Sequence, residues 1–189
     1  FRQSLRPASS TEIDQLTQLA GPLPSSYVEF LKVMGQSLGN LKVQEANLTV
    51  IEATQFYQEG EDLPDPRFLY IGENDEDPYV GYFLDRDANP DDPPIYCFEP
   101  GTENHLEDFL CFESLVDLLY WATARQYAMK PFHNHGYFTP VGGIDWKTRQ
   151  PADDVKKLAE SEGFSMVSGT GSWMQIYEPV SYTHLTLPT

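Results

Sequence analysis

The chain has 189 residues, of which 40% are hydrophobic and 13% aromatic, and its formal net charge is -17. This length suits one domain with a small appendage, and this composition is typical of a folded globular protein and excludes a disordered chain. No apolar run approaches the roughly 18 residues of a membrane-spanning helix, so we expect a cytoplasmic protein.

Two amphipathic helices are predicted near the start of the chain. In TEIDQLTQLAG, Thr11 and Asp14 have the spacing of a capping pair, and in SSYVEFLKVMG, Ser26 and Glu29 have the same spacing. A glycine ends each segment, as is common at helix C-termini. In the second segment the apolar residues follow the helical spacing and should pack against a sheet: Tyr27, Phe30, Leu31 and Met34.

Beyond the second helix the pattern becomes extended. Candidate strands, separated by turn-rich acidic loops, lie at residues 41–43, 48–51, 68–71, 80–85 and 95–98. Ser114 then caps another amphipathic helix, whose apolar stripe is Leu115, Leu118, Leu119 and Ala122. Two helices, a run of strands and a closing helix predict an α+β domain with an antiparallel or mixed sheet.

The chain beyond this domain is predicted to form an appendage. We place the main domain at residues 1–130 and a small α+β extension, packed on it, at residues 131–179. The extension contains a helix at residues 152–162 and two strands joined at SGTGS, which lacks the lysine and the following helix of a phosphate loop. The last ten residues, VSYTHLTLPT, resemble the in-frame translation of a sequencing-library adapter, and we expect them to be non-native.

The negative charge is concentrated in one segment. Residues 59–117 hold 18 acidic residues and two basic ones, Arg67 and Arg86. The two-residue period of a strand leaves the carboxylates of this segment to the flanking loops. Their field repels nucleic acid and anionic membranes and attracts cationic partners, although a purely solubilising surface is the alternative. The candidate partner-binding residues bracket one strand: Glu73, Asp75, Glu76, Asp77, Asp85, Asp87, Asp91 and Asp92.

Metal binding and catalysis by these acids fit the sequence poorly. Asp85, Asp87 and Asn89 have the first spacings of a calcium loop, but a proline and a tyrosine stand where that loop needs glycine and glutamate. General-acid catalysis by residues 75–77 needs a convergent base, which spacing in the sequence does not show. Neither reading replaces that of a charged binding surface.

The histidines and cysteines also give no site by spacing. His133 and His135 have no further ligand nearby to complete a zinc site. Cys97 and Cys111 share no metal-ligand or redox spacing, so we interpret them as free thiols. We therefore predict a protein without metal or cofactor.

A series of short motifs extends over residues 11–121. Leu23 and Pro24 precede the second helix, LYIG ends in Gly72, and GYFLD, PIYCFEP and FESLVDLL follow in that order. This order resembles the SUKH superfamily, which is named partly for the fungal Smi and Knr proteins. Members often carry Asn-Gly after the second helix, whereas this chain has Met34 before the glycine.

The resemblance implies a binding protein without catalytic activity. Bacterial members are commonly immunity proteins that neutralise a cognate toxin, and fungal relatives regulate cell-wall synthesis through protein contacts. Toxin domains that act on nucleic acids present basic clefts, so the resemblance and the charge together predict an immunity protein against a cationic toxin domain, with a nuclease as one candidate. An intracellular regulatory scaffold and an acid-dependent hydrolase are the alternatives, and the sequence does not fix the oligomeric state.

Overall fold

A computed structural model describes residues 4–43, 46–61, 63–74, 77–101, 110–128, 157, 159–161, 163–170 and 174–179. The chain divides into two units, Phe1–His135 and Gly136–Thr189, and each is described by itself. The packing of the extension on the main domain stays a prediction.

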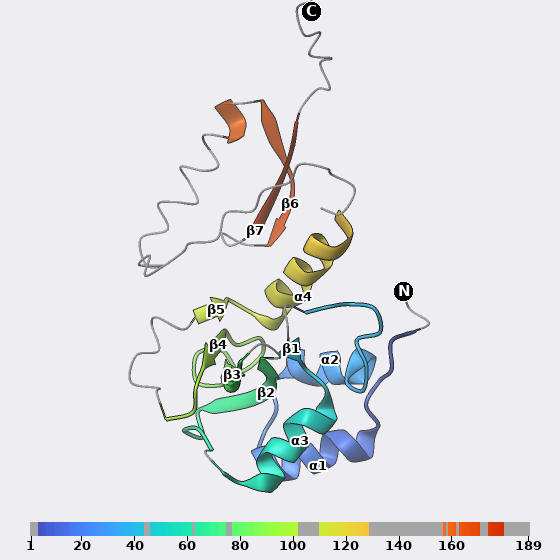
Figure 1. The fold of residues 1–189 in the computed structure, drawn as a ribbon, viewed down its shortest axis with the longest axis vertical. Helices are drawn as coiled ribbons and strands as arrows, with labels where there is room; N and C mark the ends of the chain where they lie inside the picture. The colour runs from blue at the N-terminus through green and yellow to red at the C-terminus, as the bar shows by residue number, and fades with distance from the viewer. Residues whose placement is uncertain are drawn as a thin grey trace, which may run out of the picture. The chain divides into compact units, whose positions relative to one another are not determined.

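The first unit is an α+β domain built on one antiparallel sheet (Figure 1). The strands lie in the order β1-β2-β3-β4-β5, and each neighbouring pair is antiparallel. The predicted fold class is therefore confirmed, with an antiparallel and not a mixed sheet. Its elements are α1 (Ser10–Ala20), α2 (Ser25–Met34), β1 (Ala46–Asn47), α3 (Val50–Glu59), β2 (Phe68–Asn74), β3 (Asp77–Asp85), β4 (Ile95–Phe98), β5 (Leu110–Phe112) and α4 (Leu115–Thr123), which continues as a π-helical turn (Ala124–Ala128).

The N-cap of helix α1 is Ser9, which lies two residues before the predicted cap, Thr11. The Ser9 hydroxyl accepts a hydrogen bond from the Glu12 backbone N–H, and the Glu12 carboxylate accepts one from the Ser9 N–H at 2.7 Å. This capping box satisfies two backbone donors that the helix itself leaves unpaired. The predicted capping pair of Thr11 and Asp14 is wrong, because both residues lie inside the helix.

Helix α2 begins without a side-chain cap. Its N-cap residue is Pro24, so the predicted capping box of Ser26 and Glu29 is wrong. The loop after β3 supplies the missing acceptor, since the Ser26 N–H donates to the backbone carbonyl of Asp91 at 2.9 Å. A tertiary contact thus replaces the local cap.

Helix α3 occupies a segment for which the sequence predicts a strand. Thr49 caps it by accepting a hydrogen bond from the Glu52 N–H, and Gly60 ends it in the left-handed conformation. The predicted strand at residues 48–51 is wrong because this cap and the tertiary contacts of the helix outweigh the β-propensity of Val50 and Ile51. Residues 41–43 likewise form no strand, whereas β5 was not predicted.

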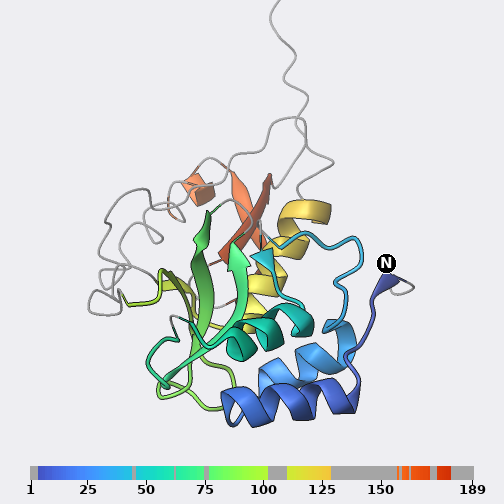
Figure 2. The same cartoon turned by 60° about the horizontal axis from the view of Figure 1, so that its bottom comes forward.

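Both faces of the central strands are buried. On one face the rings of Phe68, Tyr70, Phe83 and Phe98 contact one another, and Phe56 of α3 stacks on Tyr70 with 3.8 Å between ring centroids. On the other face the core residues are Leu69, Tyr82, Leu84 and Ile95. Figure 2 shows α1 beside α2 and α3, and α4 contacts both α2 and β5. Because both faces of the central strands are buried, the charged residues of these strands lie toward the strand ends.

The described part of the second unit is a β-hairpin. Strands β6 (Phe164–Thr170) and β7 (Met174–Pro179) pair antiparallel, which confirms the two predicted strands. The helical residues 157 and 159–161 fall within the predicted helix at 152–162. The tip of the predicted turn and residues 180–189 lie outside the described residues. Within the described part, no helix combines the length and the apolar character needed to cross a bilayer.

Candidate functional site

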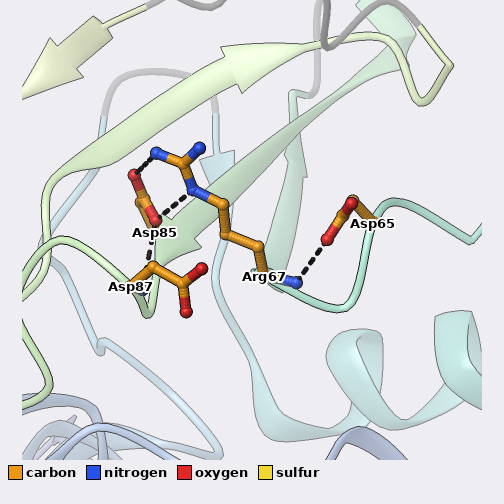
Figure 3. A network of polar contacts seen from close by, with 4 residues as sticks. All are labelled: Asp65, Arg67, Asp85 and Asp87. Carbon is orange, nitrogen blue, oxygen red and sulfur yellow. Dashed lines mark hydrogen bonds and ion pairs between the residues drawn. The ribbon is translucent and has the colours of Figure 1, made fainter.

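Acidic residues gather where β3 ends and β2 begins. Because β2 and β3 are antiparallel and Phe68 pairs with Asp85, the loop after β3 lies beside the residues that precede β2. Asp65 and Asp87 are exposed at this end, whereas Asp85 is fully buried. Figure 3 shows Arg67 reaching toward Asp85, with Asp65 and Asp87 close by. We call the exposed carboxylates of Asp65, Asp87 and Asp91 the acidic loop end.

Asp85 is an interior ion-pair partner. The Arg67 Nε donates to Asp85 Oδ1 at 2.7 Å, and the second guanidinium nitrogen contacts Oδ2. This hydrogen bonding raises the pKa of Arg67, and the guanidinium also lies 5.1 Å from the centroid of the Phe68 ring. The prediction that Asp85 is exposed in a loop is wrong. Asp85 is the last residue of β3, and its buried carboxylate neutralises Arg67.

Arg86, the other basic residue of the acidic segment, is also used internally. Its Nη1 donates to the carbonyl of Ala20 at 2.8 Å and to that of Pro22 at 3.3 Å, and its Nη2 donates to the carbonyl of Pro66. These carbonyls include the C-terminal end of α1, where a cation is favoured by the helix dipole. Both arginines of residues 59–117 are thus committed to the fold, and neither offsets the acidic loop end through a direct ion pair.

The loop that carries Asp91 is held at several points. The side chain of Asn89 accepts hydrogen bonds from the N–H groups of Asp91 and Asp92 at 3.0 and 3.4 Å. The hydroxyl of Ser25, at the start of α2, donates to the Asp91 carboxylate at 3.0 Å. Such preorganisation reduces the ordering cost that a displayed loop would incur on binding.

Asp92 joins the same loop to the start of α4. Its Oδ1 accepts a hydrogen bond from the Leu115 N–H at 3.1 Å, while Ser114 caps the helix through the Asp117 N–H. A carboxylate at a helix N-terminus is favoured by the helix dipole. Asp92 is half-buried, so its main role is structural.

Of the remaining predicted residues, Glu73 lies near the end of β2 and Asp77 at the start of β3. Glu73 is half-buried and pairs with Asn47 of β1 and Gly81 of β3. Residues 75–76 lie outside the described residues, and Asp77 begins β3 with a side chain that is not described. A strand rises about 3.3 Å per residue, so nine residues separate the two ends by roughly 25 Å. Among the described residues, the predicted acids therefore lie in two separate groups, one toward each end of the β2–β3 pair.

Metal binding needs several ligand side chains close together. Among the described residues, no group of three or more His, Cys, Asp and Glu side chains is placed to hold a metal ion. A hollow of about 330 Å³ is lined by residues between Leu38 and Leu48, and it includes none of the predicted acids. His133 and His135 lie outside the described residues.

Sequence reasoning missed Asp65 and the roles of both arginines. Asp65 accepts a hydrogen bond from the Arg67 backbone N–H at 2.8 Å, and its place beside Asp87 depends on strand pairing. One signal was present in the sequence. Asp85 ends a hydrophobic strand and Arg67 precedes another, and a buried carboxylate needs a cation as its partner.

The comparisons with known proteins bear on the same region. The family model for the SMI1/KNR4 family (SUKH-1) matches residues 7–121. The match begins before α1 and ends within α4, so it contains the sheet, the acidic loop end and both arginines. No curated protein matches the chain.

Proposed function

We propose that this chain, which belongs to the SMI1/KNR4 family (SUKH-1), is a non-enzymatic, protein-binding domain. We further propose that it acts in the cytoplasm as an immunity protein and neutralises a cognate, cationic toxin domain. The acidic loop end is the part of the described surface to which we assign the contact.

One observation carries this proposal. Asp65, Asp87 and Asp91 are exposed around a loop that hydrogen bonds hold in place, while Arg67 and Arg86 are turned to interior contacts. A cluster of one sign steers a partner of opposite sign and raises its association rate. Exposed carboxylates can also occupy a basic cleft that is built to receive phosphate groups.

The biological test is protection of the cell. The product of the neighbouring reading frame should be expressed alone and together with this chain, and growth should be measured in both cases. We expect that the neighbour is toxic alone and that this chain restores growth. A toxic neighbour that kills equally in its presence contradicts the immunity role.

The physical test is the association rate with that neighbour as a function of salt. We expect Asp65→Lys combined with Asp87→Lys to slow association about tenfold or more at 0.1 M salt, and less at 1 M, where the Debye length shrinks to about 3 Å. The matched control is Asp14→Lys combined with Glu29→Lys, two exposed acids on the helices with the same total change in charge. Equal slowing by both pairs would assign the effect to net charge and remove the site from the acidic loop end.

A regulatory scaffold of the Smi/Knr type is the second candidate, and membership of the family favours it. It predicts several partners of modest affinity, whereas an immunity protein has one tight partner. Capture followed by affinity measurement separates the two. If a single aspartate-to-asparagine change abolished turnover of a substrate without loss of folding, the chain would be an enzyme and both candidates would fail.

A further inference from the structure

Two cysteines that the sequence separates by 14 positions meet across the edge of the sheet. Cys97 lies on β4 and Cys111 on β5, which are antiparallel neighbours with Tyr96 opposite Leu110. The register shifts between Ile95 and Tyr96, so Cys111 is the extra residue of a bulge in β5. A bulge re-aims side chains at a sheet edge, and this one brings the second cysteine toward the first.

The two thiols are in contact in their reduced form. Neither cysteine forms a disulfide, and both are half-buried, so each retains access to solvent. A side-chain hydrogen bond with Cys97 and, to a smaller extent, burial raise the pKa of Cys111. Cys111 is therefore the thiol that keeps its proton and donates it toward the sulfur of Cys97.

We propose that Cys97 and Cys111 form an oxidisable dithiol site that closes to an intramolecular disulfide, with Cys97 as the attacking thiol and Cys111 as the resolving thiol. Closure brings the sulfurs from hydrogen-bond contact to a bond of about 2.05 Å. Strand β5 can supply that movement, because it has three residues, carries the bulge, and is paired only with β4 in the described sheet. The proposal is independent of the proposed function.

The reaction is a thiol–disulfide exchange with a small-molecule disulfide as the oxidant. Cys97 loses its proton, and its thiolate attacks one sulfur of the small disulfide, which expels the other half as a thiolate. Cys111 then attacks the Cys97 sulfur of this mixed disulfide and expels the second half, and its proton passes to the departing thiolate. The protein pair loses two electrons, and the small disulfide becomes two thiols.

The test is incubation of the reduced full chain with oxidised glutathione, followed by thiol counting and mass spectrometry of the intact chain and its peptides. We expect wild type to lose both thiols and two hydrogen atoms, to gain no adduct, and to recover on treatment with dithiothreitol. The oxidised form should melt about 5 °C or more above the reduced form, because the bond restrains residues 97–111 in the unfolded chain.

Two single variants identify the attacking thiol. Cys111→Ser should accumulate glutathione on Cys97, and Cys97→Ser should react about tenfold more slowly at Cys111. Circular dichroism checks that each variant is folded, and the alanine variants replace any that is not. Stable glutathione adducts on both cysteines of wild type would overturn the site. An unreactive folded chain whose urea-unfolded form oxidises readily would do the same, and equal rates for the two variants would overturn the assigned order.

Discussion

The aspartates at the end of β3 and in the loop that follows it differ in exposure. Asp85 has 0% of its surface exposed and binds Arg67, whereas Asp87, two residues later, is exposed. Asp91 and Asp92 show a similar contrast, since the first is exposed and the second is half-buried and bound to the start of α4. Within one acidic stretch, some carboxylates stabilise the fold and others remain available to a partner.

This contrast changes what negative charge means in this protein. A buried carboxylate contributes through its cation and its hydrogen bonds, and its loss is felt as lost stability. An exposed carboxylate contributes through its long-range field, and its loss is felt in association rate and salt dependence. The two kinds of acid are separable by experiment.

The largest expected effect is from removing the cation of the interior pair. Arg67→Ala leaves the buried Asp85 carboxylate without its ion-pair partner, and we expect a loss of about 2 to 4 kcal/mol in the free energy of unfolding. This loss is smaller than for a fully enclosed ion pair because the Arg67 side chain is 40% exposed. Urea unfolding measures it. Asp87→Asn is the control, for which we expect at most about 0.5 kcal/mol, and equal losses in the two variants would erase the contrast.

A smaller loss is expected at the second structural arginine. Arg86→Ala removes the hydrogen bonds to the carbonyls of Ala20, Pro22 and Pro66, and we expect a loss of about 2 kcal/mol, also measured in urea. Lys32→Ala provides the surface control, since it breaks only an exposed ion pair on α2 and should cost about 0.5 kcal/mol or less. If Arg86→Ala left the free energy of unfolding unchanged, water would be replacing the contacts of Arg86.

The two neighbouring aspartates of the loop should differ by a smaller amount. Asp92→Ala removes the acceptor for the Leu115 N–H at the start of α4 and should cost about 1 kcal/mol. Asp91→Ala should cost less, because the backbone carbonyl that receives the Ser26 N–H is retained. Thermal unfolding of both variants compares them directly, and the reverse order would contradict the roles assigned here.

The smallest effect concerns Glu12, an acid engaged at the surface. Hydrogen bonds from the Ser9 backbone, then the Ser9 hydroxyl and Gln36, lower the pKa of Glu12 from its ordinary value of 4.5. Its charge therefore stabilises the folded chain fully above pH 4.5, and this contribution is lost as the pH falls through the lowered pKa. Glutamine keeps the capping geometry, so Glu12→Gln should cost about 0.5 kcal/mol at pH 7. Urea unfolding at pH 7 and pH 3 should show this difference shrinking at the lower pH, and a constant difference would contradict the linkage.

Much of the fold could be predicted because its signals are local. The apolar spacing of α2 placed Tyr27, Phe30 and Leu31 in the core, and Ser114 caps α4 as expected. The short strand β4 matches its predicted range. Helix α3 was misread because its first residues are β-branched, so their intrinsic preference opposed the structure that packing selects.

The candidate site was predicted only in part, for a different reason. The sequence located the acidic stretch, but exposure depends on where a strand ends and on which cation lies across the sheet. Asp85 was assigned to the surface because Arg67, its partner, is 18 residues away in the chain. The sequence predicted free thiols at Cys97 and Cys111, and neither forms a disulfide. It did not place the two thiols side by side, because that depends on the pairing of β4 with β5 and on a bulge.

The sequence by itself determined the α+β class, the family, the concentration of negative charge in residues 59–117, and the helices whose apolar spacing repeats along the chain. These properties follow from composition and from periodicity over neighbouring residues. Only the tertiary structure decided which carboxylates are buried, which groups the two arginines bind, and which thiols are neighbours. The physical reason is that burial and ion pairing depend on distances through space, and strand register sets those distances between residues far apart in sequence.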